Sequence, residues 1–191
     1  AIQMLEEWQK NATRYEVKYE NQFNVRRAST FSPVFVNAAA DELVFTSTRS
    51  TDKKASVKAD PITGLPKNNL FMVRKNAAGK WGKPEMLEGE INTPETDDGV
   101  CSFASNGKTI YFTRAQQSDL ADMGTKIYVS SRTGAAWNPP QMLKIFVDST
   151  ISVAHPAIAP DGQTIYFVSD KKDGLGGKDI YKATLDGTEC K

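Results

Sequence analysis

The sequence has one histidine, two cysteines and no long apolar run. A single histidine restricts the acid–base chemistry that the chain could perform. The two cysteines, Cys101 and Cys190, are too few for a disulfide framework and say little about the redox compartment. Because the apolar runs are only a few residues long, no membrane-spanning helix is predicted. The chain starts at Ala1 without a signal-peptide pattern, as a mature or excised chain also would.

Neither sign of charge predominates. The chain carries 24 basic and 23 acidic residues, which gives a net charge of +1. A chain without a basic pole is poorly suited to nucleic acid or to an anionic membrane surface. We therefore expect no nucleic-acid partner and no direct membrane insertion. The hydrophobic content of 39% is that of an ordinary globular protein.

Three segments follow one pattern of strand, tight turn and strand. The first strands and their turns lie at 31–37, 100–107 and 155–162, and the second strands at 42–49, 109–114 and 164–170. Asn106-Gly107 and Asp161-Gly162 supply the residues that adopt positive φ in such turns. Each second strand holds a β-branched and aromatic run, such as Ile110-Tyr-Phe, which is typical of a central strand.

Each copy continues into a third strand, predicted at 70–73, 127–130 and 180–183. In the first two copies a Trp-x-x-Pro segment follows, at Trp81 and Trp137, and leads to a Met-Leu pair. We expect these pairs in a fourth strand, because the outermost strand of a blade is an edge and tolerates proline. The connection between the second and third strands varies most in length and is longest at 50–69.

This pattern predicts an all-β fold made of β-propeller blades, each with four antiparallel strands. We expect about three blades, as part of a larger five- to six-bladed propeller, and a short N-terminal helix. A β-sandwich would have no reason to repeat Trp-x-x-Pro after the third strand. The predicted domains are a helical segment at 1–14 and a partial propeller at 15–191, with blades at about 29–91, 92–146 and 147–191.

The two ends of the pattern predict an unclosed ring. Tyr15–Glu20 alternates in polarity and takes the place of a fourth strand before the first copy. After Ile180–Gly187, no Trp-x-x-Pro segment follows. Propellers close with about four to eight blades. Three alternatives remain: a piece of a longer propeller, which we favour, two copies that join into a six-bladed ring, or a ring in which Tyr15–Glu20 completes the last blade.

The third copy, His155–Asp170 followed by Gly176–Tyr181, resembles the Pro-Asp repeat of TolB-type, WD-like propellers. It is most similar to the version in Bacteroidetes envelope proteins that combine tetratricopeptide repeats, a propeller and an OmpA-type peptidoglycan-binding domain. Glu90–Thr93 fits the segment that links consecutive blades in that version. The first two copies depart from it, since Val36-Asn37 and Ala104–Gly107 replace Ala-Pro-Asp-Gly.

The resemblance implies a non-catalytic scaffolding propeller in the periplasm, associated with the outer membrane through its parent protein. The type IX secretion machinery contains a periplasmic lipoprotein of this architecture, which implies a role in anchoring the apparatus to the cell wall. The implied partners are other envelope or secretion-system proteins, together with remaining blades in the parent protein or in a second chain.

His155 would have to serve any Ser-His-Asp triad, with Ser149 or Ser152 and Asp148 as candidate partners. No Gly-x-Ser-x-Gly nucleophile elbow accompanies it. We interpret His155 as a polar residue near the central channel or at a blade turn.

Two groups of aspartates are candidates for acid–base chemistry or for metal binding. Asp97 and Asp98 precede the first strand of the second copy and are expected at the channel mouth or in a turn. A second group surrounds a glycine-rich run without the ligand spacing of a calcium loop: Asp170, Asp173 and Asp179, around 174–177. We predict no catalytic residue, no cofactor and no metal.

The long loop at 50–69 is the candidate partner contact, with Lys53, Lys54, Lys58 and Lys67. Its length is explained equally well by a mobile insertion. The alternative function is a small-ligand or carbohydrate-binding propeller, or a propeller-type hydrolase, that uses the central channel.

Overall fold

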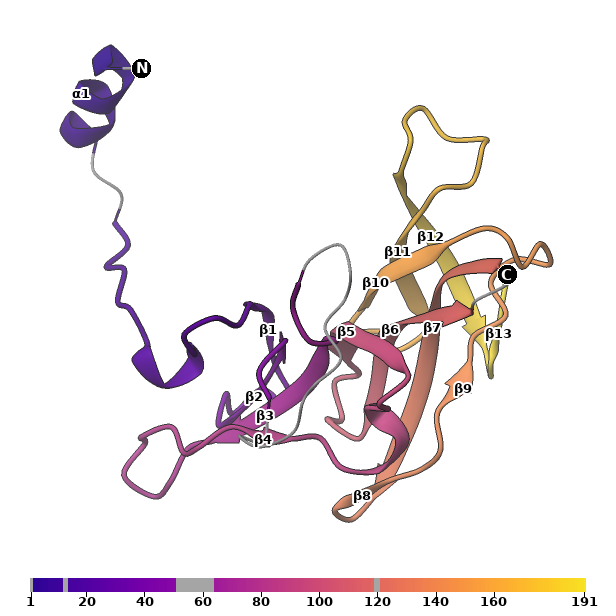
Figure 1. Cartoon of the computed structure of the whole chain (residues 1–191), viewed down its shortest axis with the longest axis horizontal. Coiled ribbons are helices and arrows are strands. Elements are labelled where there is room, and N and C mark those ends of the chain that lie inside the picture. The colour runs from indigo at the N-terminus through magenta and orange to yellow at the C-terminus, as the bar shows by residue number, and fades with distance from the viewer. Residues whose placement is uncertain (1, 12–13, 51–63, 119–120) are drawn as a thin grey trace.

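The computed structural model describes residues 2–11, 14–50, 64–118 and 121–191 (Figure 1). Three antiparallel sheets form nearly all of the regular structure after residue 29. They are preceded by one helix, α1 (Ile2–Lys10), and by a 3-10 turn, η1 (Asn21–Phe23). Figure 1 shows α1 apart from the sheets, at the end of an extended segment.

Each sheet is a meander in which strands follow one another in sequence order. The first contains β1 (Thr30–Phe35), β2 (Glu42–Ser47), β3 (Asn69–Arg74) and β4 (Glu85–Met86). The second contains β5 (Thr96–Phe103), β6 (Thr109–Ser118), β7 (Ala121–Thr133), β8 (Ala136–Trp137) and β9 (Gln141–Met142), with β8 and β9 both on β7. The third contains β10 (Val153–Ile158), β11 (Thr164–Ser169), β12 (Asp179–Asp186) and β13 (Glu189–Cys190). The predicted all-β, propeller-like fold is confirmed.

The strand register shows that the three sheets are copies of one blade. An aromatic pair faces across the second and third strands of each sheet: Phe45 and Phe71, Phe112 and Tyr128, Phe167 and Tyr181. The ring centroids of these pairs lie 6.1, 6.0 and 6.0 Å apart. Such pairs on neighbouring strands stabilise a sheet beyond the area they bury.

The hydrophobic core lies mainly between the sheets. Val44, Leu70 and Met72 of the first sheet form one cluster with Cys101 and other residues of the second. A second cluster joins the second and third sheets: it includes Tyr111, Ile127, Ile165 and Phe167. A blade therefore buries its apolar faces against its neighbours, as propeller blades do.

A β-bulge on each innermost strand marks the junction with the preceding blade. The register shifts in β1, β5 and β10, and the residues there with positive φ are Ser32 (51°), Val100 (40°) and His155 (54°). The backbone N–H of Val100 donates to Thr46 Oγ1 of the first blade at 2.9 Å. The N–H of His155 donates to Thr113 Oγ1 of the second blade at the same distance. The bulge thus directs a backbone donor toward the adjacent blade.

The segment that links the first and second blades is fixed by one asparagine. It contains the 3-10 turn η2 (Gly89–Ile91), followed by Asn92. Asn92 Oδ1 accepts a hydrogen bond from the N–H of Leu70 at 2.7 Å, and Asn92 Nδ2 donates to the carbonyl oxygens of Leu70 and Leu87. The side-chain amide therefore pairs with β3 much as another strand would.

One expectation about the ends needs correction, and the other holds. Tyr15–Glu20 forms no strand, and its side chains are exposed, because no sheet edge lies beside it to pair with. The third sheet ends with β13, which pairs only with the end of β12, so the predicted absence of the outer fourth strand, β4 or β9 in the other blades, holds for the described residues. This pairing matches the Arg132–Trp137 register of β8, and not the outer pairing of β9 beside Tyr128.

The hydroxyl acceptor at the second junction predicts a specific loss of stability. Replacing Thr113 by valine keeps the shape of the side chain but leaves the His155 N–H without its acceptor. We expect the free energy of unfolding to fall by about 1–3 kcal/mol, measured by urea denaturation. The control is Thr184→Val on an exposed part of β12, which should change it by less than about 0.5 kcal/mol. Equal losses in both variants would contradict the role assigned to Thr113.

Candidate functional site

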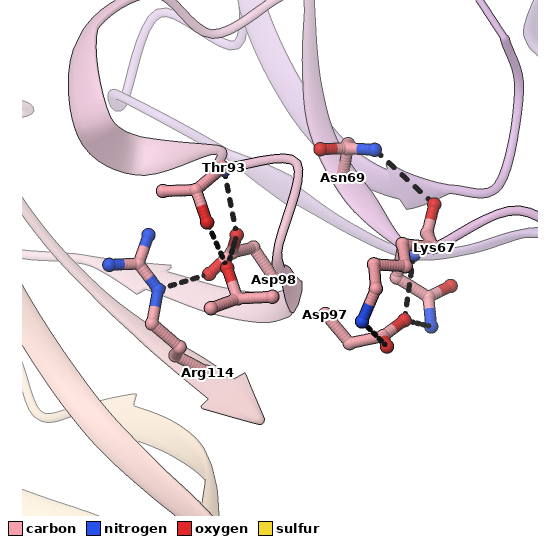
Figure 2. A network of polar contacts seen from close by, with 8 residues as sticks. Lys67, Asn69, Thr93, Asp97, Asp98 and Arg114 are labelled. Atoms are coloured by element: carbon pink, nitrogen blue, oxygen red, sulfur yellow. Dashed lines mark hydrogen bonds and ion pairs between the residues drawn. The ribbon is translucent and has the colours of Figure 1, made fainter. Parts of the chain in front are cut away.

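Asp98 is buried at the start of the second blade, on β5. Its side chain is 0% exposed, and Arg114 Nε donates to its Oδ1 at 2.5 Å (Figure 2). Its other oxygen, Oδ2, accepts from Thr96 Oγ1 at 2.6 Å and from the N–H of Thr93 at 3.2 Å. Asp98 is therefore buried on β5 and lies neither at an open channel mouth nor in a turn, the two positions predicted for it. Both of its oxygens are occupied by groups of its own blade and of the linking segment.

Arg114 connects this carboxylate to the backbone of the linking segment. Its Nη2 donates to the carbonyl oxygens of Glu90 and Ile91, at 2.8 and 3.2 Å. The guanidinium also lies over the rings of Phe112 and Tyr128, 5.2 and 5.0 Å from their centroids. Arginine is well suited to such a site, since its plane stacks on aromatic rings while its edge donates hydrogen bonds.

Burial raises the pKa of the Asp98 carboxyl, although the bonds from Arg114 and Thr96 act in the opposite direction. Removal of the carboxylate from water is therefore the largest influence on this pKa. A pair of this kind contributes little net stability when intact but is costly to break. We interpret Asp98 and Arg114 as a positioning pair and not as a general acid or base.

Asp97 joins the first and second blades at the surface. Its Oδ1 accepts from the N–H and from Nδ2 of Asn68, at 2.8 and 3.1 Å. Its Oδ2 forms an ion pair with Lys67 at 3.5 Å (Figure 2). The structure thus brings together two residues that were predicted separately, Lys67 as a partner contact and Asp97 as a channel residue. The other three lysines, Lys53, Lys54 and Lys58, lie outside the described residues.

His155 is exposed and occupies the bulge of β10. Among the described residues, no hydrogen bond joins its imidazole to Ser149, Ser152 or Asp148. Asp148 Oδ1 instead accepts from the N–H and the hydroxyl of Thr150, at 2.9 and 2.7 Å. The residues considered for a triad are therefore not assembled into one. The contact made by His155 at this position is its backbone bond to the second blade.

The aspartates around the glycine-rich turn bind groups of the third blade. Asp179 Oδ2 accepts from the N–H of Gly176 at 2.9 Å, and Asp173 Oδ1 accepts from the hydroxyl of Tyr181 at 2.8 Å. The hydrogen bond to Asp173 raises the pKa of Tyr181 to about 12. Within the described ranges, no group of three or more histidine, cysteine, aspartate or glutamate residues is arranged to hold a metal ion.

A cavity of about 530 Å³ lies at the junction of the second and third blades. Its lining includes Leu143, Phe146 and Cys190, with Lys126 at its polar side. Lys126 Nζ donates to the carbonyl oxygens of two residues of the linking segment, at 2.7 and 2.6 Å. Burial lowers the pKa of Lys126.

The register explains why the third blade differs at this place. Cys190 lies opposite Leu185, as Trp137 lies opposite Arg132. In the second blade the indole of Trp137 is 8% exposed and lies under the Arg132 guanidinium, 5.1 Å away. A thiol takes the place of that ring in the third blade and fills much less space. Half-burial raises the pKa of Cys190.

Three residues of the junctions were not recognised in the sequence: Asn92, Arg114 and Arg49. The signal for Asn92 was present, because Asn24 and Asn92 lie at the same distance before Pro33 and Cys101. Arg49 parallels Arg114, since its guanidinium lies over Phe45 and Phe71 at 4.8 and 5.2 Å. Nothing in the local sequence distinguished either arginine from a surface residue.

The chain matches no protein-family model and no curated protein sequence. Among solved structures it is similar to a puromycin-hydrolysing peptidase of Mycobacterium tuberculosis, with 14% identity, a TM-score of 0.50, and coverage of 85% of this chain and 21% of that one. It also matches a structure from work on two prolyl endopeptidases, with 16% identity, a TM-score of 0.42, and 79% and 19% coverage. A third match is a putative TolB from Agrobacterium tumefaciens, with 18% identity, a TM-score of 0.42, and 85% and 60% coverage.

The chain therefore spans less than two thirds of each of these structures. At such identities the likeness concerns the fold alone. Of the described helices, none is both long and apolar enough to cross a membrane.

The neighbouring aspartates give a matched test of the buried pair. We expect Asp98→Ala to lower the free energy of unfolding by about 3–5 kcal/mol, because it leaves the Arg114 guanidinium buried without its counter-charge. Asp97→Ala removes a partly exposed pair and should cost about 1 kcal/mol. Both losses are to be measured by urea denaturation monitored by tryptophan fluorescence. If the two losses were similar, the distinction between a buried and a surface aspartate would be wrong.

Proposed function

We propose that this chain is a non-catalytic interaction and scaffolding propeller of a bacterial periplasmic cell-envelope protein. The observation that carries the proposal is how the polar side chains are used. Asp97, Asp98 and Asn92 each form hydrogen bonds that hold blades and linking segments together. They do not converge on the cavity, and the imidazole of His155 has no carboxylate or hydroxyl partner in the described part of the chain.

The assignment to the envelope is supported by the repeat itself. The third copy, His155–Asp170 with Gly176–Tyr181, carries the Pro-Asp pattern of envelope propellers. We extend the proposal to a parent protein with an OmpA-type peptidoglycan-binding domain. In that setting the propeller contacts components of a type IX secretion apparatus and helps to anchor them to the cell wall.

The partner contact is assigned to the loop at 50–69. Lys67 is held by Asp97 and so belongs to the blade junction. The remaining lysines of the loop, Lys53, Lys54 and Lys58, are proposed to meet an acidic surface on an envelope protein. Charges at the rim of an interface act mainly on the association rate and on specificity.

A capture experiment with a charge reversal tests this role. The tagged chain is incubated with solubilised envelope proteins from a bacterium that has type IX secretion, and bound proteins are quantified by mass spectrometry. We expect the triple variant Lys53→Glu, Lys54→Glu, Lys58→Glu to reduce specific recovery about tenfold. The control reverses three exposed lysines elsewhere, Lys80, Lys83 and Lys108, and should leave recovery unchanged.

The same preparations test the absence of catalysis. We expect no turnover of ester, peptide or glycoside substrates above background, either by the chain or by His155→Ala. Turnover that is lost in His155→Ala would contradict the proposal and favour a hydrolase.

A further inference from the structure

The outer face of the first blade is built like a blade junction, and no other blade covers it among the described residues. Phe35 of β1 lies at the position that Phe103 takes in β5, since they face Leu43 and Ile110 of their own blades. Phe103 is buried against the first blade and is 9% exposed, whereas Phe35 is 51% exposed. The two faces have the same construction, and only one of them has a neighbour among the described residues.

The outer face of the third blade is the complementary surface. Tyr166 and Ile180 correspond in register to Tyr111 and Ile127 of the second blade. Tyr111 and Ile127 are 7% and 0% exposed because the third blade covers them. Tyr166 and Ile180 are 44% and 78% exposed. Apolar side chains that one blade buries at an internal junction are thus presented to solvent on the next.

A polar feature of the junction is also repeated. Asn24 follows the turn η1 as Asn92 follows η2, and its Nδ2 donates to the carbonyl oxygen of Glu20 at 3.0 Å, as Asn92 does to Leu87. Asn92 additionally binds the backbone of Leu70 on the preceding blade. Asn24 is exposed, and the position equivalent to Leu70 on the third blade is Ile180.

We propose that a second copy of this chain docks head to tail, with its first blade on the third blade of its partner. Asn24 of one copy would then bind the backbone of Ile180 of the other, and Phe35 would be covered by the partner's outer sheet face. Because each copy offers both surfaces, two copies bury all four end faces and close a ring of six blades. Six lies within the range of about four to eight in which propellers close. This contact is continuous with the two junctions already seen within the chain.

Two residues make this junction weaker than the internal ones. Val168 of the third blade is equivalent to Thr46 and Thr113, whose hydroxyl groups accept a hydrogen bond from the bulge N–H of the next blade. Valine has no such acceptor for the N–H of Ser32 in a docked second copy. Phe31 of β1 occupies the position that Gly99 takes in β5. A Cβ atom at Gly99 would lie only 2.8 Å from the side chain of Thr46, so the phenylalanine crowds a neighbouring blade at this position. The proposed dimer is therefore reversible, and it should be strengthened by substitutions that restore the internal pattern.

The first measurement is the mass in solution by sedimentation velocity over a range of concentrations. We expect a reversible dimer of the 21.0 kDa chain. Phe35→Asp and Ile180→Asp should each shift the protein to the monomer, because either change places a charge in the junction. The controls Val147→Asp and Leu175→Asp alter side chains that are 106% and 105% exposed outside the two faces, and should leave the dimer intact. Circular dichroism confirms that each variant is folded.

Two further variants distinguish a blade junction from a merely sticky apolar surface. Val168→Thr supplies the missing acceptor and should lower the dimer Kd about fivefold per junction. Phe31→Ala opens the space that Gly99 provides internally and should also tighten the dimer. Non-specific apolar association would instead be weakened by both changes. Val168→Ala, which adds no acceptor, is the control for Val168→Thr.

A monomer at every concentration would overturn the proposal. So would an open series of larger oligomers, or a dimer that does not respond to Ile180→Asp. The test is separate from that of the envelope role. The monomeric Ile180→Asp variant retains Lys53, Lys54 and Lys58, so recovery of an envelope partner by that variant is judged independently.

Discussion

The innermost strands β5 and β10 each turn one backbone N–H out of their own sheet, and a threonine hydroxyl of the preceding blade accepts a hydrogen bond from that group. The left-handed conformation that makes this possible is unfavourable for residues with a side chain, at about 1–2 kcal/mol. Val100 adopts it at a φ of 40° despite its branched Cβ. The surrounding junction must supply that energy, through the hydrogen bond to Thr46 and the apolar cluster around Cys101 and Phe103. This contact restrains the distance between adjacent blades, because a hydrogen bond to a hydroxyl acceptor tolerates little variation in length.

The three blades use different side chains toward the end of the second strand, where this strand contacts the start of the innermost strand. In the first and third blades, a serine hydroxyl donates to the backbone carbonyl of the residue just before the innermost strand. Ser47 donates to Ser29 at 2.7 Å, and Ser169 donates to Ser152 at 2.9 Å. In the second, Arg114 takes the place of the serine and donates to the carboxylate of Asp98, the residue directly opposite it, instead of to a backbone carbonyl. A buried ion pair is therefore not required by the blade architecture. Arg114 also donates hydrogen bonds to the carbonyl oxygens of Glu90 and Ile91, and these bonds attach the linking segment to the blade that follows it.

Local chemistry made the blades predictable from the sequence, and long-range geometry limited the prediction of the site. The Asn106-Gly107 turn and the aromatic strands identify a hairpin without any structure. The register set by that turn holds only as far as Cys101, and Asp98 faces Arg114 because the register shifts by one residue between Gly99 and Cys101, so their pairing could not be inferred from the turn. The bulge could not be predicted either. The sequence suggests a role for the His155 imidazole, whereas the structural contact of this residue is made by its backbone N–H. Tyr15–Glu20 alternates like a strand, but alternation alone provides no partner edge.

The third blade carries the sequence pattern most clearly and departs most at its outer junction. A turn such as Asp161-Gly162 depends on the φ that its own residues must adopt, so it is retained whatever lies beside the blade. Positions on the outer face depend on the neighbour. There, Val168 and Lys182 replace the Thr113 and Val129 of the second blade. The outer face therefore keeps the apolar residues of a junction, Tyr166 and Ile180, but lacks the hydroxyl acceptor that the internal junctions share.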